Sequence, residues 1–167
     1  YGDALDVAKT FLESGGEQVM MYNSNYYGVF GVTANYKEYA NVLETIIAPA
    51  VVEWKEAWKE DHKDDNLKDV DIDKAIVYIP INEGTPIQGT DTNTAWKAYY
   101  EAIKAGDPSA TIAGPNSAAY NTQFSGTNMR GHIQYCADNN CMPDIITWHD
   151  LQVDKLNRLK EEMQDFK

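Results

Sequence analysis

The stretch Ala75-Ile76-Val77-Tyr78-Ile79-Pro80-Ile81-Asn82-Glu83 decides the fold that this sequence predicts. Its first seven residues are almost continuously apolar and rich in β-branched side chains, which is typical of a strand buried on both faces. Such strands occur mostly in parallel sheets that are covered by helices. We therefore predict a buried parallel strand over residues 75–82, with the Glu83 carboxylate at its end.

Three further apolar runs predict strands at residues 18–22, 110–114 and 144–148. Helical patterns flank and separate the four runs, at residues 4–14, 36–60, 93–105, 126–139 and 151–166. Pro49 is expected to kink the second helix. Strict alternation of helices and strands predicts parallel strands joined by right-handed crossovers. We expect one α/β domain over residues 1–167, either a small doubly wound sheet or part of a (β/α)8 TIM barrel.

The composition argues against several classes of partner. The net charge is −12, so the surface repels phosphate backbones and we expect no nucleic-acid binding. No apolar run approaches the roughly 18 residues that a membrane span needs, so we expect no membrane partner. The acidic run over residues 59–73 lacks the central Gly and distal Glu of an EF-hand loop, and we assign no metal. No Gly-rich phosphate loop follows a strand, and we assign no cofactor.

The two cysteines, Cys136 and Cys141, enclose four residues in Cys-Ala-Asp-Asn-Asn-Cys. This spacing suits either a small disulfide loop in a secreted protein or two free thiols at a helix end, and the sequence leaves both open. Without a second pair of cysteines, a zinc site is not expected.

Polar side chains follow every predicted strand. The four sets are Asn23-Ser24-Asn25, Asn82-Glu83, Asn116-Ser117 and Trp148-His149-Asp150. Because the carboxyl ends of parallel strands meet at one edge, and ligands of α/β folds bind there, we expect these sets to share one rim.

The motifs at these strand ends resemble the clan A retaining glycoside hydrolases, which are (β/α)8 barrels. Ile79-Pro80-Ile81-Asn82-Glu83-Gly84 is similar to the fourth strand of that clan, which ends in Asn-Glu. Ala113-Gly114-Pro115-Asn116 resembles the start of the loop after the fifth strand. Residues 143–149, Pro-Asp-Ile-Ile-Thr-Trp-His, are similar to the sixth strand. The combination is nearest to family thirty-nine, the β-xylosidase and α-L-iduronidase type, although Gly84 stands where that clan usually has Pro.

The resemblance implies a role for each rim residue. Glu83 would be the general acid/base, and Asn82 would bind the sugar 2-hydroxyl. Asn23, Asn25 and Asn116 are candidate readers of sugar hydroxyls. Trp148 suits either sugar stacking or core packing, and His149 either a hydrogen bond at the site or no role. The competing interpretation of Glu83 is a surface carboxylate at a turn, with Asn82 as a cap.

Retaining hydrolysis needs two carboxyl groups about 5–5.5 Å apart. In the resembled clan the nucleophile is a second Glu at the end of the seventh strand, and this sequence has no candidate strand for it. We therefore expect an internal fragment, strands three to six of a barrel, that is inactive alone. The remaining strands would come from the same or another chain.

The expected substrate is an oligosaccharide or polysaccharide, and the expected location is extracellular or periplasmic. Two alternatives stay open: a non-catalytic carbohydrate-binding domain, and a small doubly wound domain that binds a partner.

Overall fold

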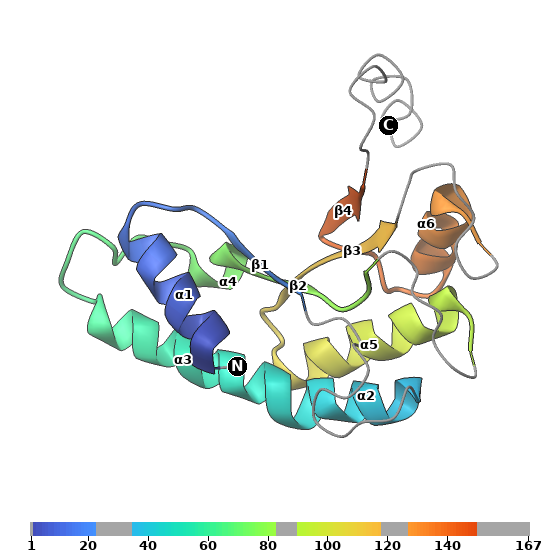
Figure 1. Ribbon diagram of the computed structural model, residues 1–167, viewed down its shortest axis with the longest axis horizontal. Coiled ribbons are helices and arrows are strands. Elements are labelled where there is room, and N and C mark those ends of the chain that lie inside the picture. Colours follow the sequence, from blue (N-terminus) through green and yellow to red (C-terminus); the bar gives the residue numbers. More distant parts are fainter. Residues whose placement is uncertain (1, 23–34, 83–89, 118–126, 150–167) are drawn as a thin grey trace, which may run out of the picture.

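The computed structural model describes residues 2–22, 35–82, 90–117 and 127–149. Its centre is one four-stranded sheet, with the strands in chain order and every adjacent pair parallel (Figure 1). The strands are β1 (Val19–Tyr22), β2 (Ile76–Ile79), β3 (Thr111–Ser117) and β4 (Ile145–Trp148). The predicted α/β class, with alternating helices and parallel strands, is confirmed.

Helices precede and connect the strands. They are α1 (Gly2–Glu13), α2 (Tyr36–Val42), α3 (Ala48–Asp61), α4 (Ile72–Ala75), α5 (Thr92–Gly106) and α6 (Met129–Asp138). The predicted helix over residues 151–166 lies outside the described residues. α4 was not predicted, because four residues inside a charged run carry no helical period.

The predicted helix over residues 36–60 is divided by a π-helical turn, η2 (Leu43–Ile47). The turn ends directly before α3, which has Pro49 in its first turn. Proline has no N–H to donate back along a helix, so the hydrogen-bond ladder is interrupted there. The irregularity expected at Pro49 therefore takes the form of a wider turn just before it.

β2 is shorter than the predicted strand over residues 75–82, because it ends at Ile79. Pro80 follows directly and has no N–H for the sheet ladder, so the regular pairing stops there. β3 extends three residues beyond its predicted end, to Ser117.

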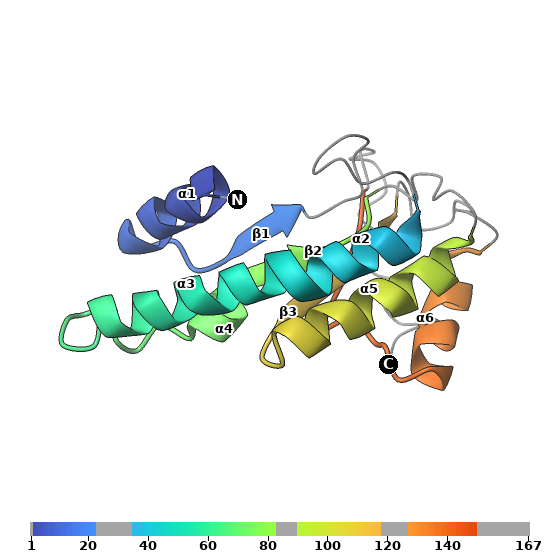
Figure 2. The same cartoon turned by 90° about the horizontal axis from the view of Figure 1, so that it is seen from below.

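One face of the sheet carries the main core. Ile76, Tyr78 and Ile112 point to this face and are fully buried with side chains from the helices. α5 contributes Trp96 and Tyr99 to the same cluster. Figure 2 shows the long helices lying across β2 and β3 on this side. Right-handed crossovers between neighbouring parallel strands place the connecting helices on one face, which accounts for the arrangement.

The opposite face, called the inner face below, has its own apolar cluster of Val77, Ile79 and Ala113, with Ile145 packed against it. The strand register places Met20 beside Val77 and Tyr22 beside Ile79, so β1 extends this face. Among the described residues, this cluster contains side chains from strands alone.

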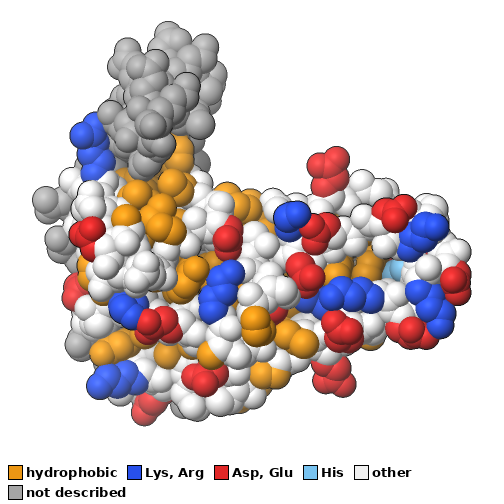
Figure 3. Space-filling view, turned by 180° about the vertical axis from the view of Figure 1, so that it is seen from behind, with side chains coloured by type: hydrophobic (Ala, Val, Ile, Leu, Met, Phe, Trp, Pro, Cys, Tyr) orange, Lys and Arg blue, Asp and Glu red, His pale blue; other side chains and the backbone are white. Residues whose placement is uncertain are grey.

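Charged side chains are spread over the surface. Seen from behind, acidic and basic side chains are interspersed across the face, and hydrophobic side chains gather around β4 (Figure 3).

Candidate functional site

The carboxyl ends of β2, β3 and β4 bring together four of the predicted site residues: Asn82, Asn116, Trp148 and His149. Asn82 follows β2, Asn116 lies near the end of β3, and Trp148 closes β4 with His149 directly after it. Asn116 is buried, and the other three side chains are half-buried. The predicted shared rim is therefore present for three of the four strands.

The remaining predicted site residues, Glu83, Asn23 and Asn25, lie outside the described residues.

A direct hydrogen bond links the ends of β2 and β3. Asn116 Nδ2 donates to Asn82 Oδ1 at 2.6 Å. The two amides are 34 residues apart in the sequence, so this contact comes from the adjacency of the two strands. The sequence predicted both as separate hydroxyl readers and missed that one holds the other.

A second link joins the ends of β3 and β4. The backbone N–H of His149 donates to the carbonyl oxygen of Ser117 at 2.7 Å, and Ser117 is the register partner of Trp148. This pairing fixes the backbone of Trp148 and His149 beside the Asn82–Asn116 pair. The half-buried Trp148 side chain remains compatible with both predicted roles, stacking and packing.

The helix side of β3 is closed tightly behind this rim. A Cβ added to Gly114 would lie 2.2 Å from Cζ3 of Trp96, so the glycine lets the indole ring pack directly on the strand. Trp96 Nε1 in turn donates to the Cys141 carbonyl oxygen at 2.8 Å. The indole therefore connects α5, β3 and the segment that leads into β4.

A buried histidine adjoins this indole and was not singled out by the sequence analysis. His132 Nδ1 lies 2.8 Å from Asn93 Oδ1, and its ring meets the Trp96 ring edge to face at 5.3 Å. Burial lowers the pKa of His132 to about 4. The ring is neutral near pH 7 and acts as a packed hydrogen-bonding group. Its position on α6 carries no sequence signal, because any exposed histidine on a helix would look the same.

Cys136 and Cys141 are both buried free thiols in this structure, which corresponds to the second of the two alternatives for this pair. Burial raises the pKa of each thiol, with the neighbouring Cys141 adding to the shift of Cys136. Both side chains are therefore protonated near neutral pH and are weak nucleophiles.

Within the described ranges, no group of three or more His, Cys, Asp or Glu side chains is placed to hold a metal ion. The described helices include none that is long and apolar enough to cross a membrane.

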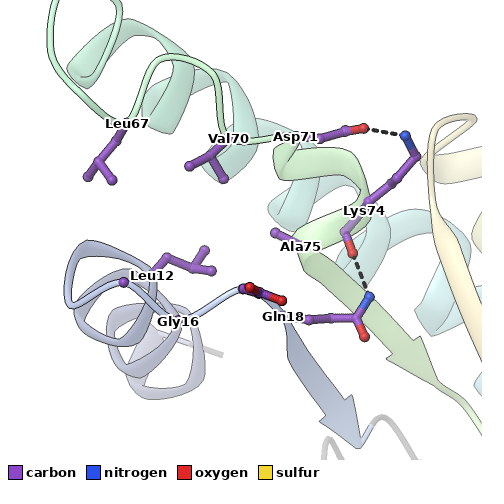
Figure 4. Close-up of a pocket in the computed structure, with 10 residues that line it drawn as sticks. Leu12, Gly16, Gln18, Leu67, Val70, Asp71, Lys74 and Ala75 are labelled. Carbon is purple, nitrogen blue, oxygen red and sulfur yellow. Dashed lines mark hydrogen bonds and ion pairs between the residues drawn. The ribbon is translucent and has the colours of Figure 1, made fainter.

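A cavity of about 520 Å³ lies at the other end of the sheet, near the beginnings of β1 and β2 (Figure 4). Its wall includes Leu12, Val70 and Ala75, and at its edge Gln18 Nε2 donates to the carbonyl oxygen of Lys74 at 3.0 Å. Ligands of parallel α/β folds bind at the carboxyl ends of strands, so this cavity is separate from the candidate site.

A buried ion pair also lies toward that amino-terminal end. Lys55 Nζ is 2.7 Å from Asp107 Oδ2 and 3.4 Å from Asp73 Oδ1. Tyr78 OH donates to the same Asp107 oxygen at 3.0 Å. Both charged partners of the shorter pair are almost completely buried. In parallel α/β folds ligands bind at the opposite, carboxyl-terminal end of the strands, so we assign this ion pair a role in stability.

Comparison with solved structures finds a similar fold in N2152 from Neocallimastix frontalis. The two chains share 21% sequence identity with a TM-score of 0.64, over 98% of this chain and 37% of the N2152 chain. This protein therefore spans well under half of the length of that relative. No protein-family model matches the sequence, and no curated protein matches it either. At this identity the likeness shows the fold alone.

Proposed function

We propose that this chain is the acid/base half of a retaining glycoside hydrolase. The observation that supports this best is the convergence at the rim: Asn82, directly before Glu83, is hydrogen-bonded to Asn116 and lies on the same edge as Trp148 and His149. Amides, an indole and an imidazole are the groups that bind sugar hydroxyls and stack on sugar faces. In the sequence, Glu83, the carboxylate of this proposal, directly follows Asn82.

In the proposed reaction, protonated Glu83 donates its proton to the glycosidic oxygen as the bond from that oxygen to the anomeric carbon breaks. A second carboxylate, on a strand outside this chain, bonds to the anomeric carbon. Ionised Glu83 then takes a proton from water, whose oxygen displaces the second carboxylate. Asn82 would hold the sugar 2-hydroxyl, an interaction that strengthens in the transition state.

The proposal places these strands within a (β/α)8 barrel. Its support is that the four parallel strands lie in chain order and that their second face carries the apolar side chains Val77, Ile79, Ala113 and Ile145. Layers of branched apolar side chains fill the interior of such barrels.

The decisive variant is Glu83→Gln in the complete polypeptide that supplies the other strands. With an aryl glycoside that has a poor leaving group, kcat should fall by about 100- to 10,000-fold, because the leaving oxygen is no longer protonated. With a strongly activated leaving group the first step needs no acid, so the loss in that step should be much smaller. Initial rates with both substrates separate the loss of leaving-group protonation from any general damage to the site.

Glu101→Gln is the matched control, because Glu101 is an exposed carboxylate on α5, in the helix layer. It should leave both rates unchanged. Unchanged turnover in Glu83→Gln would refute the acid/base role. Binding of oligosaccharides without turnover by the wild type would instead support the carbohydrate-binding alternative.

A further inference from the structure

Asn116 occupies an irregular position in the sheet. Pro115 pairs with Thr147 and Ser117 pairs with Trp148, so Asn116 is the extra residue of a bulge in β3. Its φ is 52°, in the left-handed region, and its side chain is 3% exposed. Bulges redirect side chains and are frequent beside active sites. Asn tolerates left-handed backbone better than most residues do, although the conformation still costs free energy.

The bulge aims the Asn116 amide at the neighbouring strand. Its Nδ2 donates to Asn82 Oδ1 at 2.6 Å, so the carbonyl side of the Asn82 amide faces Asn116. The Nδ2 of Asn82 lies in the same amide plane, on the other arm of the planar group, so the arm that does not accept from Asn116 is a donor. An Asn side chain held in this way is presented as a hydrogen-bond donor.

We propose that Asn116 is a positioning residue that fixes the Asn82 amide with its Nδ2 toward the substrate, so that Asn82 donates to the sugar 2-hydroxyl oxygen. This inference rests on the proposed hydrolase function. It replaces the expected role of Asn116 as a direct reader of sugar hydroxyls. The left-handed bulge is then part of the site, because regular pairing through Asn116 would place its side chain differently.

Asn116→Gly tests the side chain while keeping the backbone, since Gly adopts positive φ without strain. In the complete polypeptide, kcat/KM for a glycoside with a 2-hydroxyl should fall by about 10- to 100-fold, as expected when a contact of the transition state is misplaced. For the matched 2-deoxy glycoside, the same variant should stay close to the wild type. A purely structural role of Asn116 would lower both values equally.

Asn116→Asp is the second variant. A carboxylate accepts hydrogen bonds but cannot donate one to Asn82 Oδ1. The Asn82 amide would have to turn its Nδ2 toward residue 116. The preference for the 2-hydroxy over the 2-deoxy glycoside in kcat/KM, called the 2-hydroxyl dependence, should then be lost as in Asn116→Gly.

Asn140→Gly is the control, because Asn140 is an exposed asparagine with φ 55° in the turn before Cys141. Asn140→Gly should leave kcat/KM unchanged for both the 2-hydroxy and the 2-deoxy glycoside. Retained 2-hydroxyl dependence in Asn116→Gly or Asn116→Asp, or equal losses on both substrates, overturns the positioning role while the hydrolase function stands. No turnover of either substrate by the wild type overturns both proposals.

Discussion

At the scale of single residues, the depressed pKa of His132 makes stability depend on pH. Burial holds this pKa at about 4 in the folded chain, whereas an unfolded histidine titrates near 6.5. Between these two values the unfolded state binds the proton and the folded state does not. Stability should therefore fall as the pH drops from about 6.5 to about 4, by up to about 3 kcal/mol.

Urea unfolding of the wild type and His132→Gln at several pH values between 7.5 and 4.5 measures this contribution. The variant lacks the imidazole, so its free energy of unfolding should decline less steeply over that interval. Other acidic groups lower the stability of both proteins alike, so the difference between the two curves isolates His132. Parallel curves would show that this histidine does not couple folding to protonation.

The sequence predicted least about the contacts that individual side chains make. It selected Asn82 and Asn116 because amides at strand ends bind ligands. It could not reveal their mutual hydrogen bond, because that bond depends on a bulge in β3. A bulge inserts one residue without changing the apolar pattern around it. In the sequence Gly114 is one member of the Ala-Gly-Pro-Asn motif, whereas in the structure it makes room for Trp96.

At the scale of elements, Lys55 joins α3 to the turn between α5 and β3. Its ammonium is almost completely buried against Asp107 at 2.7 Å. Lys55→Met should lower the free energy of unfolding by about 3–5 kcal/mol, because it leaves the Asp107 carboxylate buried without a cation. Urea or thermal unfolding measures the loss.

Lys59→Met is the matched control on the same helix. Lys59 is 47% exposed and lies 3.2 Å from Glu56, so its loss should cost about 1 kcal/mol or less. The double variant Lys55→Met/Asp107→Asn removes the buried charge as well and should recover part of the stability. Equal losses in the free energy of unfolding for Lys55→Met and Lys59→Met would contradict the claim that the buried ion pair matters more than the exposed one.

The elements themselves were largely predictable, for reasons that specific residues illustrate. A helix was predicted over residues 93–105, and α5 begins at Thr92, with the Asp91 carboxylate accepting from the Thr94 N–H at 2.9 Å. α5 ends at Gly106, one residue beyond the predicted end. The errors lie where local hydrogen bonding departs from a regular pattern, at Pro80 and in the turn before Pro49. Hydrophobic spacing reports burial, and it does not register such changes.

At the scale of the whole molecule, β1 is the part of the sheet whose apolar side chains are exposed, among the described residues. Among the described residues, β1 pairs with β2 alone. On this strand Met20 is 43% and Tyr22 is 58% exposed, beside the buried Val77 and Ile79. An apolar face next to an open strand edge favours association with another chain. The proposed barrel would cover the same surface with its remaining strands.

The 167-residue chain studied alone should therefore self-associate through this face. Its net charge of −12 opposes association, so added salt should strengthen it. Met20→Glu places a charge on the inner face and should shift the chain toward monomer in sedimentation velocity runs. Val7→Glu is the control, because Val7 is 66% exposed on α1 and belongs to the helix layer. A chain that stays monomeric at high salt, or equal effects of the two variants, would contradict association through the inner face.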